Sequence, residues 1–139
     1  MTIRGRIYSP YTRITSRNHA QYETTDQFGD TVLDIGKSGF NIQNEYFSGD
    51  AYLPAITQDM LGCEINILNM NTSQMSVVSR NQKNARVVCK SSSGTDIAST
   101  NVSLTFMVVA KIKAIELPST YSNYGQYAWV CIEKREITA

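Results

Sequence analysis

Apolar and polar residues alternate along most of the chain in short runs that are separated by turn residues. In the run 63–67, Cys63, Ile65 and Ile67 fall at every second position and are therefore expected on one face of a strand. Further short strands are expected at 32–35, 40–44, 51–53, 75–78, 85–89 and 127–132. The only helical turn expected is at 57–61. Short strands with frequent turns predict an all-β fold, either an antiparallel β-sandwich or a barrel-like domain.

The longest alternation covers residues 102–115. Val102, Leu104, Phe106, Val108, Ala110, Ile112 and Ala114 share one face at a period of two residues. Such a length predicts one central strand that is bent or bulged somewhere. We expect four large residues on apolar faces to be buried: Ile65, Leu104, Phe106 and Trp129.

The beginning of the chain has a different pattern, because its apolar residues are too sparse to form a core face. We therefore divide the chain into an extended N-terminal arm, residues 1–24, and a β-sandwich domain, residues 25–139. Four arginines of the arm precede the first acidic residue, Glu23. The partner-binding residues expected in the arm are Arg4, Arg6, Tyr8, Tyr11, Arg13 and Arg17. The alternatives are a disordered tail or a first edge strand.

Composition narrows the class of protein. The length of 139 residues suits a single domain. A formal net charge of +1 argues against a nucleic-acid partner. No apolar stretch approaches the roughly 20 residues of a membrane span, and no apolar run follows the basic N-terminus as in a secretory signal. We expect a protein that is made in a cytosol and either stays soluble or is carried out of the cell by a larger assembly, without a membrane partner.

Residues with the chemistry for catalysis or metal binding are few. His19 is the only histidine and lies in a polar segment, so a histidine-based triad or a multi-histidine metal site is not expected. The aspartates lie in or beside turns, where capping explains them. Residues 26–30 lack the spacing of a calcium loop and are better explained as a surface turn. We expect no enzyme activity, no cofactor and no metal.

The three cysteines, Cys63, Cys89 and Cys131, include no close pair in the sequence. An odd number without close pairs argues against a disulfide framework and a zinc site. All three are expected to be unpaired, buried and slow to react.

A tyrosine-rich loop near the end of the chain is a possible contact surface, because tyrosine and asparagine make good contact groups. Its residues are Tyr121, Asn123, Tyr124 and Tyr127. The alternative is a loop whose tyrosines lie over the edge of the sheet.

The order of strands and turns resembles that of small β-domains in tailed-phage virion proteins, namely capsid decoration proteins and the tips of tail fibres. The residues that carry the resemblance are an early strand around Leu33 with a turn at Gly36, then Leu53-Pro54, then Gly62 before Ile65-Asn66-Ile67-Leu68-Asn69, and a late Trp129-Val130. The resemblance covers about residues 25–135 and rests on turns and strand ends, without a chemical motif.

This resemblance implies a homotrimer located in the virion. The chain lacks the repetitive shaft of a fibre protein and carries a basic arm, and both features favour capsid decoration. The expected function is therefore that of a capsid decoration, or cement, protein that binds the major capsid protein or another virion protein. The alternative is a receptor-binding tip of a tail fibre or spike that recognises the host surface.

Overall fold

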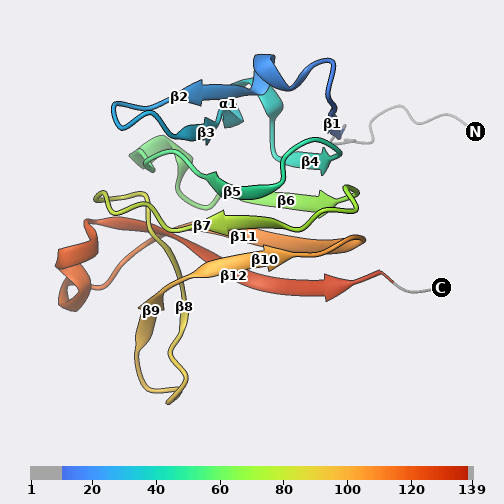
Figure 1. The fold of residues 1–139 in the computed structure, drawn as a ribbon. Coiled ribbons are helices and arrows are strands. Elements are labelled where there is room, and N and C mark those ends of the chain that lie inside the picture. Colours follow the sequence, from blue (N-terminus) through green and yellow to red (C-terminus); the bar gives the residue numbers. More distant parts are fainter. Residues whose placement is uncertain (1–10, 138–139) are drawn as a thin grey trace, which may run out of the picture.

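The computed structural model describes residues 11–137 as two β-sheets packed face to face (Figure 1). This arrangement confirms the predicted all-β sandwich. The strands are β1 (Thr12–Ile14), β2 (Glu23–Thr25), β3 (Thr31–Leu33), β4 (Asn41–Asn44), β5 (Gly49–Tyr52), β6 (Glu64–Asn69), β7 (Met75–Val78), β8 (Val87–Lys90), β9 (Ile97–Ser99), β10 (Asn101–Leu104), β11 (Val108–Glu116) and β12 (Tyr127–Glu136). Short helical segments are η1 (His19–Tyr22), α1 (Ile35–Ser38), η2 (Gln58–Met60) and η3 (Ser119–Tyr124), of which η2 was predicted.

The predicted antiparallel pairing is correct only in part, because the strand directions within the sheets are mixed. The seven-stranded sheet has the order β1-β4-β6-β11-β12-β8-β9, and the five-stranded sheet has the order β10-β7-β5-β3-β2. Strand β11 runs antiparallel to both β6 and β12, whereas β4 is parallel to β6 and β5 is parallel to β7. The chain passes from one sheet to the other after β4, β5 and β6, so strands two apart in sequence become parallel neighbours. Strands β4 and β6 therefore point toward one end of the sandwich, and β5 and β7 toward the opposite end (Figure 1).

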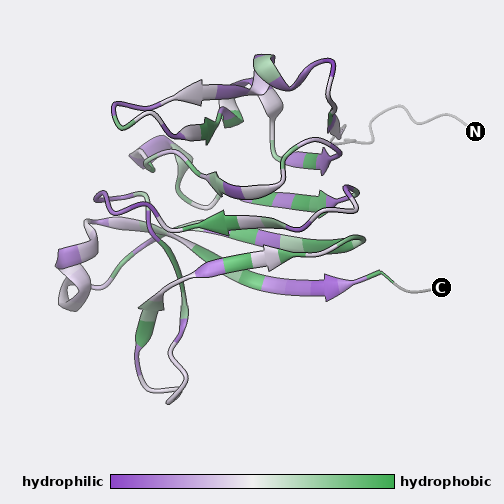
Figure 2. Ribbon diagram, in the orientation of Figure 1, coloured by the Kyte–Doolittle hydropathy of each residue, from purple (hydrophilic) through white to green (hydrophobic). Residues whose placement is uncertain are grey.

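The core lies between the two sheets and consists of buried apolar residues, which alternate with polar residues along strands such as β4 and β6 (Figure 2). Trp129, Ile65 and Leu104 are each 0% exposed, as predicted. The indole Nε1 of Trp129 donates a hydrogen bond to the carbonyl oxygen of Pro54 at 2.9 Å, so this large residue is buried without leaving its donor unpaired.

The prediction of one long strand over 102–115 is wrong, and so is the predicted burial of Phe106. The chain leaves the five-stranded sheet after β10, turns at residues 105–107 and enters the seven-stranded sheet as β11. Met107 has a φ of 63°, in the left-handed region that ends a strand. Phe106 lies in the turn, outside both sheets, and is 45% exposed, whereas Val108 begins β11 and is buried.

The described part of the predicted arm belongs to the sandwich. Strand β1 pairs with β4 and β2 pairs with β3, and Ile14 is 0% exposed in the main core. Residues 12–24 therefore belong to the domain, with β1 at the edge of the seven-stranded sheet and β2 at the edge of the five-stranded sheet. One buried isoleucine and two short strand pairings hold them there. The other arm residues predicted to bind a partner, Arg4, Arg6 and Tyr8, lie outside the described residues.

A second, smaller core lies beside the main one. Its buried members are Val88, Leu117 and Ala128, from β8, the segment before η3, and β12. The β8–β9 hairpin extends from the sandwich next to this small core (Figure 1). The three cysteines are unpaired, as predicted, but each is partly exposed rather than buried.

None of the helices within residues 11–137 has the length and apolar character needed to cross a membrane.

Candidate functional site

A buried arginine organises the surface beyond the ends of β5 and β7. Arg80 follows β7 by two residues, and its side chain is only 8% exposed. Its Nη2 lies 2.7 Å from Oδ2 of Asp26, and its Nη1 lies 2.6 Å from Oδ2 of Asp30. The guanidinium carbon lies 4.7 Å from the ring centroid of Phe28 and 4.6 Å from that of Tyr52. We call these five residues the Arg80 cluster; they join the β2–β3 turn to the ends of β5 and β7.

The β2–β3 turn is shaped by its own aspartate before Arg80 adds to it. Oδ1 of Asp26 accepts hydrogen bonds from the backbone N–H groups of Phe28 and Asp30, at 2.8 and 3.0 Å. Gly29 has a φ of 82°, which glycine adopts without strain. The turn therefore presents both carboxylates to one cation, and in this structure that cation is the guanidinium of Arg80.

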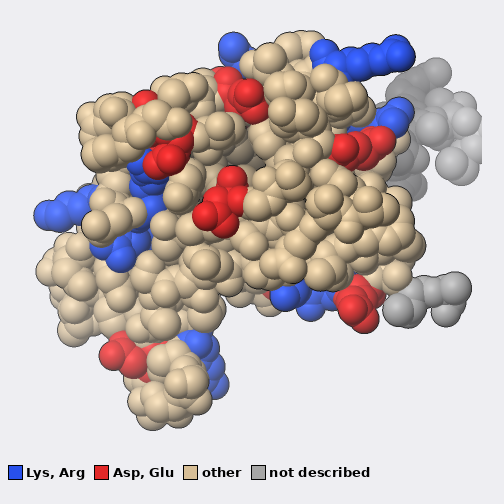
Figure 3. All heavy atoms as spheres, in the orientation of Figure 1, with Lys and Arg blue, Asp and Glu red and all other residues tan. Residues whose placement is uncertain are grey.

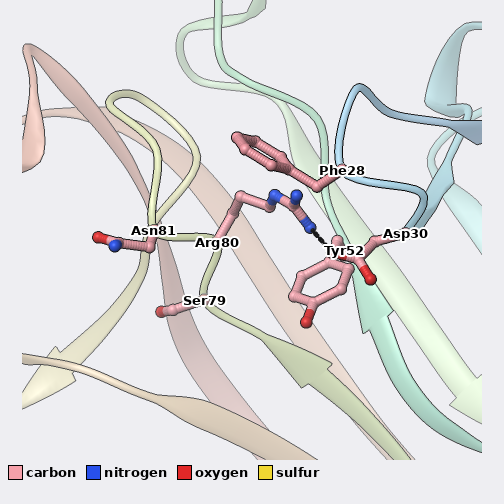
Figure 4. Close-up of a pocket in the computed structure, with 6 residues that line it drawn as sticks. All are labelled: Phe28, Asp30, Tyr52, Ser79, Arg80 and Asn81. Carbon is pink, nitrogen blue, oxygen red and sulfur yellow. Dashed lines mark hydrogen bonds and ion pairs between the residues drawn. The ribbon is translucent and has the colours of Figure 1, made fainter.

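The Arg80 cluster borders an open pocket (Figure 4). The pocket has a volume of about 430 Å³ and is also lined by Ser79 and Asn81. The ring of Phe28 is 62% exposed at its rim. The guanidinium has little capacity left for a ligand, since two carboxylates and two rings already contact it. What remains available for binding is the exposed side of Phe28, Asn81 and the half-exposed carboxylate of Asp30.

At the opposite end of the sandwich, two asparagines fix the loops. Asn44 ends β4 and Asn69 ends β6; they are partners in the parallel ladder, and both are 0% exposed. Nδ2 of Asn44 donates to Oδ1 of Asn69 at 2.9 Å and to the carbonyl of Phe47 at 2.8 Å. Nδ2 of Asn69 donates to the carbonyls of Leu104 and Ser73, at 2.7 and 3.1 Å. The pair thus joins three loops that connect the two sheets.

Tyr46 and Phe106 project from two of these fixed loops, and Ile137 directly follows β12. Tyr46 is 38% exposed, Phe106 is 45% exposed and Ile137 is 40% exposed. The backbone of Ile137 donates to the carbonyl of Met107 at 2.8 Å, which places the end of β12 beside the β10–β11 turn. The ring of His19 stacks on Tyr46 with centroids 3.6 Å apart. We call Tyr46, Phe106 and Ile137 the loop-end surface. Sequence reasoning missed it, although the asparagines at the ends of two alternating runs were a visible signal.

The predicted contact loop is largely engaged within the molecule. The hydroxyl of Tyr121 donates to Oδ1 of Asp96 at 2.6 Å, which lowers the pKa of Asp96 and raises the pKa of Tyr121. The guanidinium of Arg86 lies over the ring of Tyr124, and Tyr127 lies in the main core. Asn123 is exposed. The tyrosines therefore hold η3 and the β8–β9 hairpin together.

The described arm residues lie on the surface near the edge strand β1. Tyr11 is 61% exposed, and Arg17 is also exposed. Arg13 makes a two-pronged ion pair with Glu45, with nitrogen–oxygen distances of 2.6 and 2.8 Å. The hydrogen bond from Arg13 is the main reason that the pKa of Glu45 lies below its ordinary value.

Charge does not single out a site on the face drawn in Figure 3. On the face drawn in Figure 3, basic and acidic side chains are interspersed, without a large area of one sign. Among residues 11–137, no group of three or more histidine, cysteine or acidic side chains is placed to hold a metal ion.

Comparisons of this chain with protein-family models, with curated proteins and with solved structures find no match.

Proposed function

We propose that the chain is a structural virion protein, a capsid decoration protein that assembles as a homotrimer and binds the major capsid protein. The observation that supports this proposal is the loop-end surface. Tyr46 and Phe106 are exposed there on loops that two buried asparagines hold in place, and Ile137 is exposed beside the β10–β11 turn. A rigid apolar surface loses little conformational entropy when it binds, so it suits a lasting contact with another protein.

The basic N-terminal residues extend the proposed contact. Arg4 and Arg6 precede β1, an edge strand, and Tyr11 and Arg17 are exposed beside it. These groups would contact acidic and aromatic groups of the capsid protein. Three such chains in one trimer would convert weak individual contacts into tight binding through effective concentration.

Co-sedimentation of the purified protein with empty phage heads that lack it tests the proposal. Phe106→Ser should weaken head binding by at least about tenfold, since central aromatic residues carry much of the binding energy at protein interfaces. Phe40→Ser is the matched control. Phe40 is 44% exposed, nearly as much as Phe106, but it precedes β4, at the opposite end of that strand from Asn44 and the loop-end surface. Both variants should melt at nearly the same temperature as the unchanged protein.

Deleting residues 1–10 should also weaken head binding while the domain stays folded, since β1 and Ile14 remain. Light scattering should give a mass three times that of the chain. Full binding by both Phe106→Ser and the truncated protein would contradict the decoration role, and a monomer both in solution and on heads would contradict the trimer.

A receptor-binding tip of a tail fibre or spike is the second candidate. The observation that favours it is the pocket of the Arg80 cluster, where an exposed ring and polar groups face solvent together. Aromatic and amide groups in one open pocket suit a polar ligand such as a surface glycan. On this alternative, the protein binds host cells or a glycan panel, Asn81→Ala removes that binding, and empty heads are not decorated.

A further inference from the structure

Two cysteines that are distant in sequence occupy adjacent positions on neighbouring parallel strands. Strand β8 pairs with β12 through Val87 with Trp129 and Val88 with Val130. Cys89 and Cys131 each directly follow the last paired residue of their strand. Residues at matching positions of parallel strands project to the same side of a sheet. The two thiols are therefore placed on one side of the sheet, side by side.

The spacing of the two strands suits a covalent bond between these residues. Neighbouring strands lie about 4.7 to 4.9 Å apart, which falls within the Cα separation of about 4.4 to 6.8 Å found for disulfides. The β8–β12 ladder ends at Val88 and Val130, and beyond it β8 continues into the β8–β9 hairpin. Within that hairpin, Cys89 is paired with Ala98 of β9.

Both cysteines are reachable from solvent. They line one surface groove of about 270 Å³, together with Val102, Ile132 and Lys134. Ile132 is 51% exposed at this groove, and both cysteines are partly exposed. A small soluble reagent can therefore reach the thiols without unfolding of the domain. Cys63 does not line this groove; it precedes β6 elsewhere in the sandwich.

We propose that Cys89 and Cys131 form a redox-active thiol pair, which a low-molecular-weight disulfide such as oxidised glutathione converts to an intramolecular disulfide. One cysteine thiolate attacks a sulfur of oxidised glutathione, its S–S bond breaks, and one glutathione leaves as a thiolate. The second cysteine thiolate then attacks the mixed disulfide, which releases the second glutathione. The two cysteines together lose two electrons and two protons. These electrons and protons are taken up by oxidised glutathione, which becomes two molecules of reduced glutathione.

Burial raises the pKa of the Cys131 thiol, which also donates a hydrogen bond to the carbonyl of Glu133 at 3.5 Å. A raised pKa lowers the fraction of Cys131 that is present as thiolate, the attacking species. Either cysteine can make the first attack on glutathione in this scheme, and the other, held beside it, closes the disulfide.

The disulfide would join the β8–β9 hairpin to the sheet. It closes a loop of about 40 residues, a length for which the chain-entropy model gives substantial stabilisation. We expect the oxidised protein to melt several degrees higher than the reduced protein. This inference does not depend on the proposed virion function.

The test uses the full chain with millimolar oxidised glutathione, followed by thiol counting and peptide mapping without reductant. The unchanged protein should fall from three free thiols to one, lose the mass of two hydrogen atoms, stay a single chain on a non-reducing gel, and yield a linked Cys89–Cys131 peptide. Reduction should reverse each change.

Cys63→Ser is the matched control and should still close the bond, whereas Cys89→Ser and Cys131→Ser should not. Peptide mapping of the unchanged protein keeps the test independent of whether a variant folds. Three thiols remaining free, stable glutathione adducts without closure, a bond that includes Cys63, or a bond between two chains would each overturn the proposal.

Discussion

The two ends of the sandwich hold their loops by different physical means. Beyond β5 and β7, Arg80 is held between two carboxylates and two rings. Beyond β4 and β6, Asn44 and Asn69 bind each other and the carbonyls of the crossing loops. One end relies on charge and the other on neutral hydrogen bonds.

This difference follows from burial. Both asparagines are 0% exposed, and an unpaired charge at such a depth would cost far more than an amide that makes all of its hydrogen bonds. In the Arg80 cluster, the Asp30 side chain is 45% exposed, so water shares the cost of the charges. An ion pair is therefore tolerated where solvent is near, and neutral amides hold the drier end.

The largest effect is expected at the asparagine end. Asn69→Ala should lower the free energy of unfolding by about 3 kcal/mol, because buried carbonyls and the amide of Asn44 lose their partner at about 1 to 3 kcal/mol for each unsatisfied group. Urea unfolding measures this loss. Asn66→Ala is the control on the same strand. Asn66 is only part-buried and donates a hydrogen bond to Asn41, so this variant should lower the free energy of unfolding by less than about 1 kcal/mol. Equal losses for the two variants would contradict the role given to the buried pair.

A smaller effect is expected in the Arg80 cluster. Arg80→Met keeps an apolar stem between Phe28 and Tyr52 but leaves two aspartates without their cation. Breaking a buried ion pair costs about 3 to 5 kcal/mol, and the exposure of Asp30 reduces the expected loss here to about 2 kcal/mol.

A further change at Asp26 separates charge from packing in this cluster. Adding Asp26→Asn to Arg80→Met should recover part of the lost stability by removing one of the two like charges, and a double-mutant cycle measures the recovery. High salt should reduce the loss in free energy of unfolding that Arg80→Met causes relative to the unchanged protein. The loss caused by Asn69→Ala should not depend on salt. The same salt response in both series would show that charge does not distinguish the two ends.

The smallest effect is expected at the exposed Arg13–Glu45 pair. Because the folded-state pKa of Glu45 is lowered, its contribution to stability is present above the unfolded pKa and is lost as pH falls through the folded pKa. Arg13→Met should raise the pKa of Glu45 toward the ordinary value of a glutamate, as followed by NMR titration of the carboxyl. An unchanged Glu45 pKa would show that the ion pair is not formed in solution.

Sequence reasoning was most successful where the deciding contacts are local. The strand predicted at 75–78 is β7, and the helical turn predicted at 57–61 contains η2. Alternation also placed Ile65 and Trp129 in the core. It failed at Phe106, because period-two alternation continues unchanged through a turn that carries the chain into the other sheet.

The features that distinguish this protein depend on contacts between distant residues. Arg80 meets Asp30 from 50 positions away, and Asn44 meets Asn69 from 25 positions away. Cys89 and Cys131 have no visible relation in the sequence until β8 is placed beside β12. Alternation is a property of single strands, so the amino-acid order was sufficient for the all-β class and much of the core. The pairing of strands depends on how the whole chain buries its apolar faces, so the mixed sheets, the two differently held ends and the thiol pair emerge only when the domain is folded.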